Sequence, residues 1–478
     1  MKKNQSKNKN GLEIVAIIGM TLLLEYAINF LETPIKDLIL WSIIFISIGV
    51  FLLNFDKKNM NKNIVYLIYF AGLMIRTVYI LKTDITIRQH DVGSIDEEGH
   101  LAYIYILYST FKLPTTNIWQ FYHPPLWHFI ASLWMRLHTI LNQDKIALEG
   151  IQALTVCLSS LTILITNKIC EKLKMKDIHR CLTILLIAFH PTMIILSGSI
   201  NNDILMIMLE YLIILLLINW YKEANYKNTI LLAIVTGLCV MTKMNGAVMA
   251  VPILYVFFAK AWDLFVKNKK MKKAYIQDFL LKMFIFGMIS LPIGLWFQVR
   301  NIVLFDTNNV PNPGKGLYVG KHSFISRFLT IDFPSLFRYA FTKPEYNLPS
   351  YLIKTSVFGE YSYGKMGLVE IVLVVLSVII LLISTILMIK YLIKDRKNVT
   401  INMLIVTLVT NLISMIVFNM KYPYICSMDF RYVAIVILPI IVMITYSLNT
   451  IKNKFLRIPI EIVICFFILF SIIFELKI

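Results

Sequence analysis

The sequence is poor in charged residues and in cysteine, and both shortages narrow the possible folds. Only 16% of its 478 residues are charged, against 58% that are hydrophobic, and the mean hydropathy is +0.71. This composition excludes a soluble enzyme, a disordered scaffold and a DNA-binding regulator. Most of the six cysteines fall in or beside apolar segments, so no external disulfide framework is expected.

The chain is rich instead in apolar runs of about 20 residues, each long enough to cross a ~30 Å hydrocarbon core. The sequence therefore predicts an all-α polytopic membrane protein. We expect about 13 transmembrane helices, at roughly 12–30, 36–55, 64–82, 147–166, 178–198, 201–220, 229–242, 244–259, 276–298, 367–389, 401–420, 432–449 and 457–475.

The distribution of basic residues predicts the orientation of these spans. Strict alternation from the Lys-rich N-terminus places more than half of the 47 Lys and Arg residues in loops on one side, which the positive-inside rule makes cytoplasmic. The short connections on the other side hold four, namely Lys36, Lys243, Lys421 and Arg431. The net charge of +19 therefore indicates membrane topology rather than nucleic acid binding.

Two predicted external segments, 83–146 and 299–366, are too long to be simple connectors, and long ordered loops usually carry function. They divide the chain into an N-terminal transmembrane module (1–298), an external subdomain (299–366) and C-terminal transmembrane helices (367–478). The first loop also contains two apolar, aromatic stretches, which we interpret as interfacial helices that roof the bundle.

Acidic residues and histidines are concentrated in that first loop. The segment RQHDVGSIDEEGH carries His90, Asp91, Asp96, Glu97 and His100, and QFYHPPLWH follows with His123. A carboxylate near an apolar roof can act as a general base, although a solvated acidic loop is the simpler alternative. A divalent metal ion is also possible, but the spacing matches no specific metal site.

Other polar residues lie at the predicted outer ends of spans. Asn202 and Asp203 form a turn that could equally be a helix cap. Lys243, Arg300 and Arg431 are either snorkelling anchors or ligands for a phosphate group. We expect these five residues, with His90, His100 and His123, to bind substrate.

The order of these motifs resembles one family of membrane enzymes. An acidic first external loop, HPPL at an interfacial helix, NND, TKxxG, W-x-x-RN and a late DFRY are together similar to GT-C glycosyltransferases that use polyprenyl-phosphate sugars. This branch includes protein O-mannosyltransferases and the lipid A aminoarabinose transferase. The resemblance spans about residues 60–435, but the chain has three predicted spans, rather than one, before the acidic loop.

The resemblance implies a GT-C-like bundle and a reaction on the outer face of the cytoplasmic membrane. A first-loop carboxylate would deprotonate an acceptor hydroxyl as it attacks the anomeric carbon with inversion, and basic residues would hold the lipid phosphate. We favour Asp91 as the base and keep Asp96 with Glu97 as the alternative. The acceptor could be a cell-envelope polymer, a glycolipid or a protein.

Two other functions compete with this one. A transporter or flippase of lipid-linked glycans would be expected to carry charges at the membrane midplane and an internal repeat, and we find neither. An O-antigen polymerase or ligase is kept open by the basic residues of the 299–366 loop.

Overall fold

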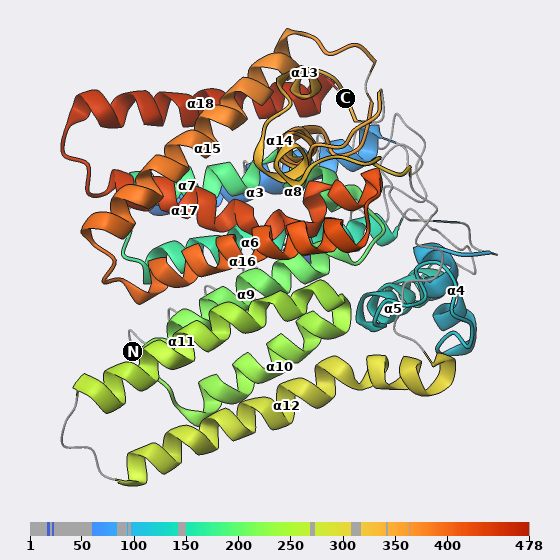
Figure 1. Ribbon diagram of the computed structural model, residues 1–478. Coiled ribbons are helices and arrows are strands. Elements are labelled where there is room, and N and C mark those ends of the chain that lie inside the picture. Colours follow the sequence, from blue (N-terminus) through green and yellow to red (C-terminus); the bar gives the residue numbers. More distant parts are fainter. Residues whose placement is uncertain are drawn as a thin grey trace.

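The computed structural model describes residues 17–19, 22, 60–83, 93, 97–141, 150–267, 273–306, 317–340, 343–362 and 364–477. Every regular element in these ranges is a helix, apart from one isolated antiparallel bridge between Tyr318 and Tyr424. The all-α prediction is confirmed. The long helices lie side by side as a bundle, with α4 and α5 grouped at one end (Figure 1).

The helices run in the following order: α3 (Met60–Lys82), α4 (His100–Thr110), α5 (Leu126–Leu141), α6 (Ile151–Lys172), α7 (Asp177–Ala188), α8 (Pro191–Ile195), η1 (Leu196–Gly198), α9 (Asp203–Lys222), α10 (Tyr226–Thr242), η2 (Met244–Met249), α11 (Ala250–Trp262), η3 (Asp263–Lys267), α12 (Lys273–Phe305), η4 (Ile325–Leu329), α13 (Phe333–Leu336), α14 (Leu348–Phe358), α15 (Leu368–Lys394), α16 (Val399–Lys421), η5 (Ile425–Met428), η6 (Phe430–Val436), α17 (Ile437–Leu448) and α18 (Lys454–Lys477).

The described part of the chain contains nine helices long and apolar enough to cross a membrane, or ten if one bent pair counts as a single span. The total of thirteen is therefore not confirmed. The first two predicted spans, 12–30 and 36–55, lie almost entirely outside the described residues. Each of the other predicted spans coincides with a helix or with a bent pair of helices.

The bent pair is α7 with α8 and η1, which meet at 53°. His190 separates them in an extended conformation (φ −68°, ψ 125°), and Pro191 starts α8. A proline disfavours helical geometry in the residue before it, so this local sequence accounts for the bend.

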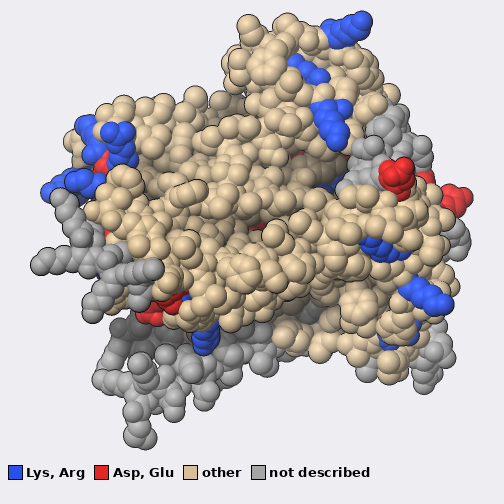
Figure 2. Space-filling model, turned by 60° about the horizontal axis from the view of Figure 1, so that its bottom comes forward, with Lys and Arg blue, Asp and Glu red and all other residues tan. Residues whose placement is uncertain are grey.

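The described residues also include both helices predicted in the first external loop, as α4 and α5. Each is too short to cross the bilayer, so their position at the membrane interface stays a prediction. Figure 2 shows Lys, Arg, Asp and Glu mostly toward the two ends of the molecule, with a broad uncharged surface between them. That distribution suits a hydrocarbon-facing belt.

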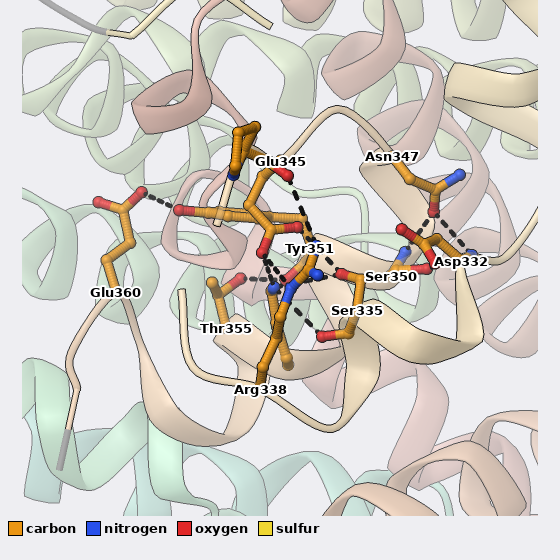
Figure 3. Close-up of polar contacts among 11 residues, drawn as sticks. Asp332, Ser335, Arg338, Glu345, Asn347, Ser350, Tyr351, Thr355 and Glu360 are labelled. Carbon is orange, nitrogen blue, oxygen red and sulfur yellow. Dashed lines mark hydrogen bonds and ion pairs between the residues drawn. The ribbon is translucent and has the colours of Figure 1, made fainter. Parts of the chain in front are cut away.

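Part of the expected external subdomain is held by buried polar contacts (Figure 3). Glu345 accepts hydrogen bonds from Lys354 and Ser335 and forms an ion pair with Arg338 at 3.3 Å. Lys354 and Glu345 are almost fully buried, so each charge requires the other. These contacts fix α14, which also packs against η6.

The sidedness of the bundle can be tested with single cysteines at two exposed lysines. In a variant with Cys426 and Cys465 replaced by serine, Lys112→Cys should react with a membrane-impermeant maleimide in intact cells. Lys172→Cys should react only after permeabilisation, because positive-inside topology places it in the cytoplasm. The reverse pattern would overturn both the topology and the expected outer face.

Candidate active site

A buried ion cluster lies where α9, α10 and η6 meet. We define it as Asp203, Lys243, Asp429, Arg431 and the ring of Tyr432. One oxygen of the Asp203 carboxylate accepts from Lys243 Nζ, and the other accepts from Arg431 Nη1 at 3.3 Å. Arg431 Nε also pairs with Asp429 at 3.0 Å. Two cations thus meet two carboxylates, as burial of charge requires.

Lys243 enters this cluster because the helical conformation is interrupted at this residue. α10 ends at Thr242, Lys243 is extended (φ −157°, ψ 136°), and η2 begins at the next residue. Gly246 makes the turn possible, since a Cβ there would lie 2.7 Å from Cys239 Sγ and 2.9 Å from its backbone carbonyl carbon. The TKMNG motif is therefore a tight turn that directs a lysine into the protein.

Arg431 is positioned by the residues on either side of it. The Asp429 side chain accepts from the Arg431 backbone N–H at 3.1 Å, and the Phe430 N–H donates to Thr355 Oγ1 of α14 at 3.1 Å. Arg431 Nη2 donates to the Tyr432 hydroxyl at 3.0 Å. The Tyr432 ring centroid lies 4.7 Å from both Lys243 Nζ and Arg431 Cζ, so one aromatic ring contacts both cations.

A stack of histidines connects the two helices of the first loop. His100 begins α4, and its Nδ1 lies 2.9 Å from His128 Nε2 of α5. The two rings are stacked with centroids 5.1 Å apart, and the His123 ring also stacks on His100, with centroids 5.6 Å apart. Tyr103 extends the stack against His128 at 4.0 Å. The HPPLWH segment thus folds both of its histidines onto the start of α4.

The His123 imidazole of the stack lies close enough to the ion cluster for the charges of Lys243 and Arg431 to shift its pKa. Burial lowers the pKa of His123 well below its usual value, and the positive charges of Lys243 and Arg431 lower that pKa further. A neutral imidazole at this position can accept or donate a hydrogen bond without adding a third positive charge.

Other predicted site residues lie around these two groups. Asn202 is buried and its Nδ2 donates to the Thr242 carbonyl at 3.2 Å, which joins the start of α9 to the end of α10. Glu97 is exposed, three residues before the buried His100. Three more predicted residues, His90, Asp91 and Asp96, lie outside the described residues.

Arg300 is placed differently from Lys243 and Arg431. Its Nη2 donates to the Pro114 carbonyl at 2.6 Å, and its Nη1 donates to Asn301 Oδ1 at 3.0 Å. It therefore fixes the connection after α4, whereas Lys243 and Arg431 converge on Asp203. Of the three cations expected at a phosphate site, Lys243 and Arg431 thus share one carboxylate, whereas Arg300 bonds to a backbone carbonyl and to Asn301.

Sequence reasoning missed four members of these groups, namely Tyr103, His128, Asp429 and Tyr432. His128 lies five residues after His123 in the same motif, and that spacing was its only signal. Asp429 and Tyr432 flank Arg431 in CSMDFRY, where the alternation of acidic, basic and aromatic residues could have indicated them. Among the described residues, no group of three His, Cys, Asp or Glu side chains could hold a metal ion, so the possible divalent ion stays a prediction.

Comparison with known proteins bears on the segment that contains Asp203, Lys243 and two of the stacked histidines. Residues 122–289 match the family model of dolichyl-phosphate-mannose-protein mannosyltransferases. The resemblance to glycosyltransferases is confirmed over this segment. It includes His123, Asn202, Asp203 and Lys243, while Arg300 and Arg431 lie beyond it. A search of curated proteins found no match.

Two solved structures are also similar to the chain. ArnT from Cupriavidus metallidurans bound to undecaprenyl phosphate matches at 13% identity over 81% of this chain and 77% of that chain, with a TM-score of 0.37. The apo state of ArnT from the same organism matches at 12% identity over 80% and 78%, with the same TM-score. A likeness at this level assigns no function.

Proposed function

We propose that the protein transfers a sugar, with inversion, from a polyprenyl-phosphate donor to an acceptor hydroxyl on the outer face of the cytoplasmic membrane. The observation that carries this proposal is the convergence of Lys243 and Arg431 on one buried carboxylate, beside the histidine stack. Two cations held together at a helix end suit a phosphate leaving group. The family match over 122–289 supports the same class of reaction.

The chemistry requires one bond to form and one to break at the anomeric carbon. The acceptor oxygen attacks that carbon, its proton passes to a first-loop carboxylate, and the sugar–phosphate bond breaks. The electron pair of that bond goes to the phosphate oxygen, whose growing negative charge Lys243 and Arg431 stabilise. Asp203 keeps both cations in place before the donor binds.

An apolar cavity next to the ion cluster gives the isoprenoid chain a place to lie. The cavity has a volume of about 430 Å³ and is lined by Phe430, the neighbour of Arg431, and by Ile437 and Ile441 of α17. Helix α15 contributes one of its faces to the lining, through residues spaced three or four apart: Ser377, Ile380, Leu381, Ser384, Thr385 and Met388. A cavity that follows helices lengthwise suits a linear hydrocarbon.

The donor can be identified by titration of the purified enzyme with a panel of polyprenyl-phosphate sugars. We expect Arg431→Ala to weaken apparent donor affinity by about 1.5–3 kcal/mol, the value of a charge-assisted hydrogen bond. Arg431→Lys should restore this only in part, because the planar fork is lost. Unchanged donor affinity in a folded Arg431→Ala protein would mean that the donor phosphate does not bind at this cluster.

Arg300→Ala is the comparison variant in the same titration. Its guanidinium is bonded to the Pro114 carbonyl, so we expect a smaller effect on donor affinity than in Arg431→Ala. Equal weakening in the two variants would extend the phosphate site to Arg300, as the sequence alone predicted. Transport of the lipid-linked glycan without sugar transfer would instead favour the flippase alternative.

A further inference from the structure

A second cavity, with a polar lining, lies at the opposite end of the bundle from the ion cluster. It has a volume of about 340 Å³ and forms between the end of α15, the end of α17 and the turn into α18. Both loops concerned, at 390–398 and 449–457, are Lys-rich and are predicted to be cytoplasmic. In Figure 1 the α15–α16 and α17–α18 connections lie at the left-hand end, where Figure 2 shows a group of Lys and Arg side chains.

Three lysines line this cavity without a counter-charge of their own. Lys390 and Lys394 are one helical turn apart on α15, and Lys452 faces them from the turn before α18. Within the described part of the chain, none of the three forms an ion pair, and Asp395 is the one carboxylate in the lining. Like charges four residues apart destabilise a helix, so an anion in the cavity would remove that repulsion.

Helix geometry and hydroxyl groups add further polar groups to the lining. α18 begins at Lys454, and Asn453, which lines the cavity, accepts a hydrogen bond from the Phe455 N–H at 2.9 Å. The positive end of the α18 dipole therefore lies beside the lysines. Tyr446 also lines the cavity, and its hydroxyl accepts from Asn398 Nδ2 at 3.2 Å, which leaves its own hydrogen available to an acceptor.

Large apolar side chains project from the protein next to these lysines. Ile393 is 75% exposed and directly precedes Lys394 of the lining, and Phe455 is 90% exposed and directly precedes Leu456 of the lining. A soluble anion would not benefit from such neighbours. A lipid would, because its phosphate meets ammonium groups while its acyl chains meet apolar side chains at the same depth.

We propose that this cavity binds the headgroup of an anionic glycerophospholipid of the cytoplasmic leaflet. The lining carries an excess of two positive charges, three lysines against Asp395, which suits a phosphodiester with one or two negative charges. This lipid would join the inner ends of α15, α17 and α18. The site is separate from the proposed transfer reaction and does not depend on it.

The test uses the full-length protein in detergent, with bound lipid counted by native mass spectrometry. The probes are dioleoylphosphatidylglycerol, dioleoylphosphatidylcholine and inorganic phosphate. We expect phosphatidylglycerol to bind in preference to phosphatidylcholine. The triple variant Lys390→Gln, Lys394→Gln, Lys452→Gln should bind it roughly tenfold or more weakly, since each lysine near an anionic headgroup contributes to attraction.

The matched control is the triple variant Lys174→Gln, Lys176→Gln, Lys227→Gln, which removes the same charge from exposed lysines elsewhere on the predicted cytoplasmic side. It should bind phosphatidylglycerol as the unmodified protein does. Equal loss in the two triple variants would overturn the proposal in favour of general attraction to the basic surface. Displacement of phosphatidylglycerol by inorganic phosphate at equal concentration, or equal binding of phosphatidylcholine, would also overturn it.

Discussion

Asp91→Asn is expected to remove most of the sugar transfer activity while the protein remains folded. An amide keeps the shape of the side chain but cannot take the proton of the acceptor hydroxyl, and a positioned general base contributes about 10²–10⁴-fold to rate. The measurement is the single-turnover rate at saturating donor, with the unfolding temperature recorded beside it. Donor affinity should change little, because we propose that Lys243 and Arg431 hold the phosphate.

Asp96→Asn and Glu97→Gln are the matched variants, because they lie in the same loop and lose the same charge. Glu97 is exposed and precedes the buried His100 by three residues, so we expect its replacement to be tolerated. An inactive Asp96→Asn beside an active Asp91→Asn would move the base to Asp96. Full activity in all three variants would exclude Asp91, Asp96 and Glu97 as the base.

The positions of the described spans along the sequence were predictable because the bilayer constrains the length and composition of each span, while their orientation stays a prediction. Hydrocarbon thickness fixes the length of each apolar run, and the positive-inside rule relates loop charge to side. Even the division at Lys243 followed, since two short apolar halves meet at TKMNG and the structure has α10 and η2 on either side of it. The bend at His190 was not predicted, because the sequence was interpreted as one continuous span over 178–198, although Pro191 indicates a break in the helix.

The candidate site was predictable only residue by residue. Lys243 and Arg431 were expected at the outer ends of spans, but that Asp203 lies between them depends on how α9, α10 and η6 pack. Arg300 has the same sequence signal and bonds elsewhere. A local stretch of sequence carries no information on the distances between helices, so the pairing of these charges could not be predicted.

Asp203→Ala is expected to lower the free energy of unfolding by about 3–5 kcal/mol, because it leaves buried cations without their shared carboxylate. Lys243 loses its ion pair with Asp203, whereas Arg431 keeps its pair with Asp429 at 3.0 Å. Chemical unfolding in detergent micelles measures the effect. Combining Asp203→Ala with Lys243→Met should recover part of the loss, since the buried charge disappears with its partner.

The matched control is Asp278→Ala, which breaks an ion pair with Lys282 in which the Asp278 side chain is 42% exposed, against 0% for Asp203. Exposed pairs contribute about 0.2–1 kcal/mol, so this variant should remain close to the unmodified protein. A loss in Asp203→Ala no larger than in Asp278→Ala would mean that the ion cluster does not require its central carboxylate.

Asp203→Ala also distinguishes a purely structural role of the ion cluster from a role in binding phosphate. A ligand that binds only the folded state raises its stability, and a phosphate can occupy the position that the Asp203 carboxylate leaves between Lys243 and Arg431. Undecaprenyl phosphate should therefore raise the unfolding temperature of Asp203→Ala more than that of the unmodified protein, in which the carboxylate competes for both cations. Equal shifts in the two proteins would mean that the lipid phosphate binds away from this carboxylate and that Lys243 and Arg431 serve only to hold α9, α10 and η6 together.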